Sequence, residues 1–275
     1  MKHHGIRDAA QLVGFEPEEG PSMRMSLTIV LGFLLLITGT ARAQGVVLPL
    51  PPEDQQKITA QLGPGVVGNA LPSQPIGDVS TYFPLTSRSL TYQITSGPKA
   101  GNSESSEVAR VRRPGGRLAW RLTLSPSLTG FIAQGMDGWL VMPAVSDPGE
   151  GVVIVTTPAN PFVPKGMQPG ETRSFSQKVS VNYLDNPTDQ DYSGSLNGTY
   201  TYVGTYQVTV PAGTFPAVLF RANSEGKVGP AHTNDTAYTF FAPNVGLVAM
   251  IMQEDATAFW IFHIDTTTGK VLTSK

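Results

Sequence analysis

The predicted mature chain contains two histidines, the residue type that most often serves as a general base. His263 and Asp265 alternate along an apolar segment, so they share one face of a predicted strand, and a serine from a neighbouring strand would complete a hydrolytic triad. His232 lies in a segment rich in Gly and Pro, which predicts a loop. The sequence has neither a Gly-x-Ser-x-Gly elbow nor a His-Glu-x-x-His helix. We therefore expect no enzymatic activity, and hydrolysis is only the third functional hypothesis.

One acidic segment resembles the first half of a calcium-binding loop. Asp189, Asp191 and Ser193 place oxygen atoms at alternate positions, and Gly194 follows where such a loop turns sharply. The twelfth position is Tyr200, where the loop needs a bidentate glutamate. The sequence favours a solvated hairpin loop, with calcium binding as the alternative and no cofactor predicted.

A glycine pattern at residues 63–68, Gly-Pro-Gly-Val-Val-Gly, matches the letters of the dinucleotide fingerprint. That fingerprint works between a strand and a helix, whereas this segment follows a predicted helix and contains Pro64. We interpret it as a turn.

Four arginines flank the turn Pro114-Gly115-Gly116. A two-residue alternation places all four on one face of a hairpin, opposite Val111 and Trp120, and they form the predicted anionic-ligand patch: Arg110, Arg112, Arg117 and Arg121. A solvated face that discourages edge pairing is the favoured interpretation. The functional alternative is contact with an anionic envelope component such as lipid phosphate.

The composition excludes several classes of function. The 275 residues include no cysteine, so thiol nucleophiles, cysteine-ligated zinc, iron–sulfur clusters and disulfide exchange are excluded. Charged residues are 15% of the chain and the net charge is −2, so no broad basic field would attract nucleic acid. The 29 glycines and 23 prolines are typical of many strands joined by tight turns.

An export signal is predicted near the amino terminus. The apolar segment 27–37 is short for a membrane span, Arg24 precedes it, and Ala41-Arg42-Ala43 follows with the small residues that signal peptidase requires. We predict cleavage after Ala43, so residues 1–43 are assigned to the signal peptide. We expect translation to start at Met23 or Met25. The product is expected in the periplasm or outside the cell, without a membrane span and, lacking cysteine, without a lipid anchor.

The predicted mature chain divides into an arm and a β domain. Residues 44–79 are rich in proline, with one short helix expected from Pro52 to Leu62. Residues 80–275 show period-two patterns, clearest at 173–183 and 199–210, where Gly204 is expected to bend or bulge a long strand. The segments 247–252 and 259–264 are apolar on both faces and should be covered on both sides. We predict an all-β fold, a single long-stranded, curved antiparallel sheet resembling a half-barrel.

Three segments carry a family resemblance: Tyr82-Phe83-Pro84-Leu85 with Leu90-Thr91-Tyr92, then residues 210–215 (VPAGTF), and residues 242–248 (APNVGLV). Residues 80–255 thereby resemble bacterial exported proteins of unknown function, which are similar in outline to the curved sheets of periplasmic lipoprotein carriers. Asn244 stands where Gly is usual. The resemblance implies a sheet that wraps around apolar ligands.

These observations lead to two principal functional hypotheses. The first is a non-enzymatic binding or carrier module for an apolar or envelope-derived ligand, because apolar strand surface is in excess and includes Met142, Met250 and Met252. The second is a structural or protein-interaction domain whose arm fills the sheet concavity itself. A lipid or envelope component is the expected partner.

Overall fold

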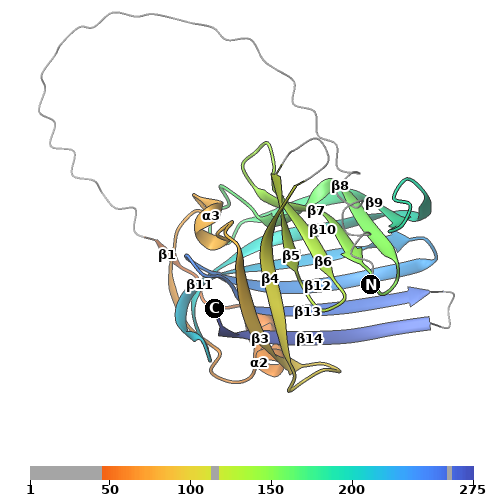
Figure 1. The fold of residues 1–275 in the computed structure, drawn as a ribbon. Helices are drawn as coiled ribbons and strands as arrows, with labels where there is room; N and C mark the ends of the chain where they lie inside the picture. Colours follow the sequence, from red (N-terminus) through yellow and green to blue (C-terminus); the bar gives the residue numbers. More distant parts are fainter. Residues whose placement is uncertain (1–44, 113–117, 259–261) are drawn as a thin grey trace, which may run out of the picture.

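The molecule is a closed β-barrel of twelve strands with an amino-terminal arm packed on it (Figure 1). The computed structural model describes residues 45–112, 118–258 and 262–275. The predicted signal peptide lies outside these residues. The barrel strands are β3 (Arg88–Ser96), β4 (Ser103–Arg112), β5 (Leu118–Thr123), β6 (Thr129–Gln134), β7 (Leu140–Asp147), β8 (Val152–Val163), β9 (Thr172–Tyr183), β10 (Gln190–Val210), β11 (Gly213–Val228), β12 (Ala231–Ala242), β13 (Gly246–Ala258) and β14 (Phe262–Ser274).

The strands follow one another around the barrel in chain order. Each pairs antiparallel with the next, and β14 then pairs with β3, with Lys270 opposite Ile94 and Leu272 opposite Tyr92. The prediction of an all-β antiparallel fold is confirmed, but the open half-barrel was wrong. Closure leaves no free barrel edge, so the backbone donors and acceptors that an open sheet would expose are paired between β3 and β14.

The arm contributes four elements: β1 (Val46–Val47), α2 (Pro52–Leu62), β2 (Val67–Ser73) and α3 (Val79–Tyr82). Helix α2 has the predicted limits, with Pro52 in its first turn and Gly63 at φ 100° after its end. It lies on the outside of the barrel against β3, β13 and β14. Strands β1 and β2 were not predicted.

Strand β10 bends at the glycine where the sequence predicts a bend or bulge. Up to Thr201, β10 pairs with β9, whereas from Thr205 onward it pairs with β2. Between these two halves the register with β11 shifts at Gly204, whose φ is 155°. The bulge lets one strand belong to the barrel wall and also hold the arm.

The strands bury two cores, one inside the barrel and one centred beneath α2 on the outer face. The inner core takes side chains from opposite walls, including Val108, Ile132 and Phe220, together with Val79 and Phe83 at α3. The outer core lies beneath α2, and its members include Ile58, Leu62, Tyr206, Phe240 and Ile251. The arm therefore covers one face of the wall and fills part of the other.

The prediction that β13 is covered on both faces is confirmed for its first half. Leu247 belongs to the inner core, while Val248, Ala249 and Ile251 belong to the outer core. The companion prediction for 259–264 falls largely outside the described side chains, and Ile264 itself is 56% exposed. The turn before β13 contains Asn244 at φ 62°, a left-handed conformation that Asn tolerates better than most residues.

Candidate functional site

The wall formed by β9 to β12 presents different chemistry on its two faces. Cross-strand partners share a face, and successive residues of a strand alternate between faces. Tyr200 and Phe220 belong to the inner core, which fixes the inner face of β10 and β11. Arg221 contacts Asp54 of α2, which fixes the outer face.

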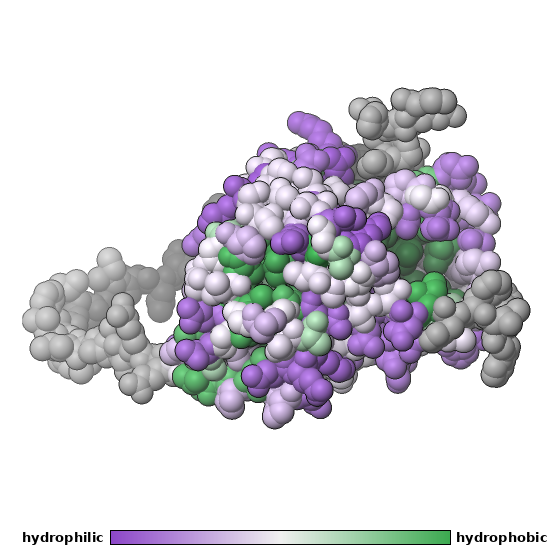
Figure 2. Space-filling model, turned by 90° about the horizontal axis from the view of Figure 1, so that it is seen from below, coloured by the Kyte–Doolittle hydropathy of each residue, from purple (hydrophilic) through white to green (hydrophobic). Residues whose placement is uncertain are grey.

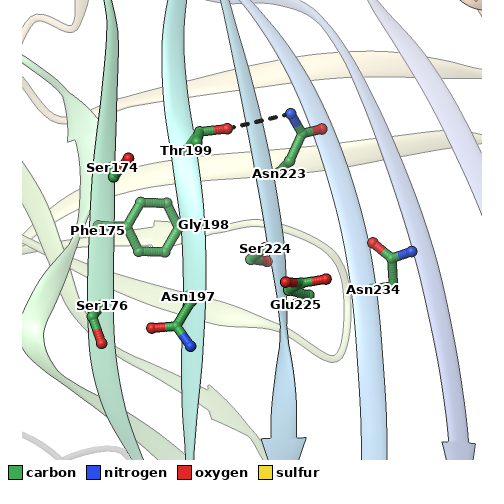
Figure 3. Close-up of a pocket in the computed structure, with 10 residues that line it drawn as sticks. All are labelled: Ser174, Phe175, Ser176, Asn197, Gly198, Thr199, Asn223, Ser224, Glu225 and Asn234. Carbon is green, nitrogen blue, oxygen red and sulfur yellow. Dashed lines mark hydrogen bonds between the residues drawn. The ribbon is translucent and has the colours of Figure 1, made fainter.

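The outer face contains a polar depression of about 670 Å³ (Figure 3). The register arranges its side chains in two rows that cross the strands, one through Ser174, Thr199 and Asn223, the other through Ser176, Asn197, Glu225 and Asn234. The backbone of Phe175, Gly198 and Ser224 runs between the rows, so these residues complete the lining.

Hydrogen bonds order the first of these rows. The Thr236 hydroxyl donates to Asn223 Oδ1 over 3.1 Å, and Asn223 Nδ2 donates to Thr199 Oγ1 over 3.5 Å. Two further depressions continue along the same face, one beside Lys178 and the other beside Lys227 and His232. The side chains that line these depressions are mainly hydroxyl, amide and charged groups, and the depressions are open to solvent, so they do not match the apolar concavity that the sequence predicts.

The inner face of the same wall is more apolar beyond the core. Following the register from Tyr200, one inner row runs through Ala222, Ala237 and Met252, and Met250 lies one step nearer the core. These four side chains are half-buried, so solvent reaches the inner face there. Trp120 borders the same inner core from β5. Seen from below, the molecule is mostly hydrophilic, with apolar side chains gathered in recessed areas (Figure 2).

Polar atoms are buried without partners farther along this inner face. Gln177, Leu196, Gly226 and Thr233 are successive cross-strand neighbours from β9 to β12. Gln177 is 3% exposed, and within the described part of the chain neither its Nε2 nor Thr233 Oγ1 has a hydrogen-bond partner. A buried amide without a partner costs about 1–3 kcal/mol, so these atoms require an explanation.

An acidic group lies in the neighbouring inner row. Asp235 is the cross-strand partner of Ser224, and its Oδ1 accepts a hydrogen bond from the Asp255 N–H over 3.3 Å. Burial, followed by repulsion from Glu254 and Asp255, raises the pKa of Asp235 to about 6. The inner wall therefore changes along the strands from apolar side chains to hydrogen-bonding and acidic ones.

A second buried charge on the inner side of the barrel is fully paired. Lys270 is 4% exposed, and its Nζ donates to Glu104 Oε1 over 2.6 Å and to the Leu124 carbonyl over 2.7 Å. The same nitrogen lies 5.2 Å from the centre of the Tyr92 ring. Because its partners are all protein groups, we assign this pair to the architecture of the barrel.

The predicted arginine patch does not form as one face. Arg110 is opposite Trp120 and Arg112 is opposite Leu118, whereas Arg121 is opposite Ala109. Arg110 and Arg112 therefore share the inner face, and Arg121 lies on the outer face, 3.0 Å from Glu107. Arg117 lies outside the described residues. The prediction of a single face assumed a short turn between the two strands. Five residues separate the paired residues Arg112 and Leu118, and this length turns the side chains of one strand to the opposite face. Anion binding by these residues stays a prediction.

The other candidate residues occupy ordinary strand positions. His232 is in β12 rather than in a loop, and it is exposed beside Lys227. The His263 backbone pairs with Thr257, while its side chain lies outside the described part, so the pair with Asp265 is not tested.

Two further segments have sequences that resemble ligand-binding loops, and the structure shows both as turns and adjoining strands. The predicted hairpin is present, but only Asp189 lies in its turn, whereas Asp191 and Ser193 belong to strand β10. The Tyr183 hydroxyl donates to Asp191 Oδ1 over 3.0 Å. Residues 63–66 form the predicted turn after α2, and Val67 and Gly68 begin β2.

Among residues 45–112, 118–258 and 262–275, no group of three or more His, Asp or Glu side chains could hold a metal ion. Neither helix in those ranges is long and apolar enough to cross a membrane.

No family model and no curated protein matches the chain. Two solved structures are similar to it. A putative lipoprotein from Parabacteroides distasonis has 15% identity and a TM-score of 0.35, over 73% of this chain and 99% of that one. A putative exported protein with a YmcC-like fold from Bacteroides fragilis has 12% identity and a TM-score of 0.35, over 68% of this chain and 93% of that one. At these scores neither likeness bears on function.

Proposed function

We propose that this protein is an exported, non-enzymatic binding module whose ligand places an apolar chain against the inner wall of the barrel. The observation that carries the proposal is the inner row Ala222, Ala237 and Met252, with Met250 beside it, which is apolar and yet reached by solvent. Covering such side chains with an acyl chain removes apolar surface from water, worth about 25 cal/mol per Å². Methionine adapts to varied ligand shapes.

The same geometry explains why the outer depression is a weaker candidate for this ligand. Its two rows carry hydroxyl, amide and carboxylate groups, which lose hydration when an apolar chain covers them. A substitution on the inner face of this wall can therefore be compared with one on its outer face.

The test is native mass spectrometry of the protein purified without detergent, followed by titration with the fluorescent apolar probe N-phenyl-1-naphthylamine. Co-purified lipid, or saturable probe binding, supports the proposal. Met252→Asp should weaken probe binding at least tenfold, whereas Gln253→Asp, one residue along on the outer face, should leave it within twofold. A clean unliganded mass together with no probe binding would overturn the proposal.

One observation favours the second candidate, a structural or protein-interaction domain. Ile76, Val79 and Phe83 of the arm and α3 already occupy part of the inner core. If the arm alone covers the apolar side chains of the inner wall, native mass spectrometry should show only the unliganded protein and the probe should not bind.

A further inference from the structure

The outer depression across β9 to β12 offers a binding surface separate from the inner wall. We infer that it binds an uncharged oligosaccharide that lies across the strands, with about one sugar unit over each strand. The depression has a volume of about 670 Å³, which is within the range of small-molecule sites. Every side chain of its two rows is exposed or half-buried, so a ligand can reach them all.

The groups that line the depression both donate and accept hydrogen bonds. The side chains of its two rows are hydroxyls and amides with one carboxylate: Ser174, Ser176, Thr199, Asn197, Asn223, Asn234 and Glu225. Asn197 and Asn234 make no side-chain hydrogen bond to the described part of the chain, so both amides are available to a ligand. A sugar carries several hydroxyl groups, and each of these is likewise a donor and an acceptor. A polyhydroxylated ligand therefore matches this lining.

The strand register gives such a ligand its direction. Ser176, Asn197, Glu225 and Asn234 lie on four adjacent strands as successive cross-strand partners, and Figure 3 shows the last three on neighbouring strands. Adjacent strands are about 4.8 Å apart, close to the length of one sugar unit in an extended β-linked chain, so this row spans roughly 14 Å. The other row lies two residues along each strand, roughly 7 Å away. A sugar chain between the rows would meet polar side chains along both edges.

Charges of both signs on this face favour an uncharged ligand. Glu225 lies in the depression, whereas Lys178 and Lys227 lie on the same face, each two residues along its strand from the nearer row. None of the three forms an ion pair with another residue in the described ranges. Like charges brought together across an interface cost binding energy. A polyanion would meet Glu225, and a polycation would meet the two lysines.

The same lining argues against a protein partner. The centres of protein interfaces are enriched in aromatic residues, Met and Arg, and the two rows contain none of these. A sugar ring therefore has no aromatic side chain in the rows to stack on, and its affinity depends on hydrogen bonds exchanged with water. Each such bond contributes little, so we expect dissociation constants in the high micromolar to millimolar range.

The experiment titrates the mature protein with N-acetylglucosamine oligomers of one to five units, using isothermal titration calorimetry at physiological ionic strength. Affinity should rise at least tenfold from the monosaccharide to the trisaccharide. It should change less than twofold beyond the tetrasaccharide, because the row spans four strands. Oligomers of hyaluronan, which are anionic, and of glucosamine, which are cationic, should bind at least threefold more weakly at equal length.

The variants assign binding to the depression. Asn197→Ala combined with Asn234→Ala should weaken trisaccharide binding about tenfold, because two exposed amides are lost. Asn69→Ala is the matched control, since Asn69 is an exposed residue of β2 outside the depression, and it should leave the affinity within twofold. Met252→Asp on the inner wall should also leave sugar binding within twofold.

The outcomes separate this inference from the proposed function. No binding of any oligomer, equal affinity for the monosaccharide and trisaccharide, or equal losses in the double variant and Asn69→Ala would each overturn the glycan site. Tighter binding of either charged series overturns the uncharged ligand. Binding of N-phenyl-1-naphthylamine should be the same in the double variant as in the unaltered protein, so the apolar inner wall is judged by that probe alone.

Discussion

One buried carboxylate links α2 to the barrel wall. Asp54 of α2 is 1% exposed and accepts hydrogen bonds over 2.8 Å from Arg221 Nη1, at both oxygens, and from the Tyr238 hydroxyl. Burial and then the bond to Asp54 raise the pKa of Tyr238, so this hydroxyl stays a donor. The cluster fixes α2 at one position along the outer wall.

Asp54→Ala should therefore destabilise the protein. The substitution leaves Arg221, whose side chain is 23% exposed, and Tyr238 without their shared acceptor, so we expect a loss of about 3 kcal/mol in the free energy of unfolding. Urea denaturation measures it. Glu53→Ala is the matched control, because Glu53 is 77% exposed and 3.7 Å from Arg221; its loss should stay below about 0.5 kcal/mol. Equal losses would contradict this role for Asp54.

Asp235 makes stability depend on pH. Its pKa is raised from 3.8 to about 6, so between these values the folded protein retains a proton that the unfolded chain has released. Stability should consequently fall as pH rises through this window and stay lower above it. Asp235→Asn should remove this slope and increase stability at pH 8 by about 1–2 kcal/mol. Thermal unfolding at pH 4, 6 and 8 tests it; an unchanged slope in the variant would assign the effect elsewhere.

For single residues, the sequence indicates which side chains carry charge or hydrogen-bonding groups, but not which residues lie beside them in the fold. The sequence shows that Arg110 and Arg121 are arginines, but it does not show on which face of the sheet each side chain lies. That depends on the pairing register of the two strands, which the length of the turn between them sets. The sequence analysis did not single out Gln177. No local signal marks it, because its burial results from strands that are distant in the sequence.

Among the strands, β10 shows that a bend at a glycine can be predicted from the sequence pattern alone. A strand of 21 residues exceeds the usual length, and Gly204 interrupts the alternation of tyrosine and threonine on either side of it. The strand ends were not predicted, because residues 190–198 are mostly Ser, Gly, Asn and Asp, which carry little apolar periodicity. Strand β6 was missed because its short apolar run lacks alternation.

Gly204→Ala should be destabilising by about 1–2 kcal/mol. A β-carbon at this position would lie 3.0 Å from the Tyr206 hydroxyl oxygen, and its φ of 155° suits glycine. Gly68→Ala is the control, because its β-carbon would meet its nearest neighbour at an ordinary 3.5 Å. Chemical denaturation of both variants measures the difference, and similar stabilities would show that the bend tolerates a side chain.

For the whole molecule, closure was not predictable from the patterns. Alternation indicates which face of each strand is buried, but it does not distinguish an open curved sheet from one whose first and last strands meet. The covering of β13 on both faces was predicted, and the structure identifies the cover as α2 outside and the barrel core inside. The arm proved to be part of the folded unit because Ile58 and Leu62 of α2 are buried against the barrel wall.

Removing the arm tests this dependence. A chain that starts at Pro64 lacks α2 and exposes the outer core around Phe240 and Ile251, so we expect its Tm to fall by at least about 10 °C. A chain that starts at Leu48 lacks only β1, whose valines are each 54% exposed, and should melt within about 2 °C of the mature chain. Similar melting of all three would show that α2 is dispensable.

The pairing of β14 with β3 has a consequence for the order of folding. Every other barrel pairing joins consecutive strands and can form locally as a hairpin, but this one brings residues 269–274 to residues 91–96, across almost the whole domain. Contacts between such distant segments form slowly, because a long loop must close first. A chain that emerges amino terminus first therefore cannot complete its barrel until β14 has emerged, and until then β3 presents an unpaired edge.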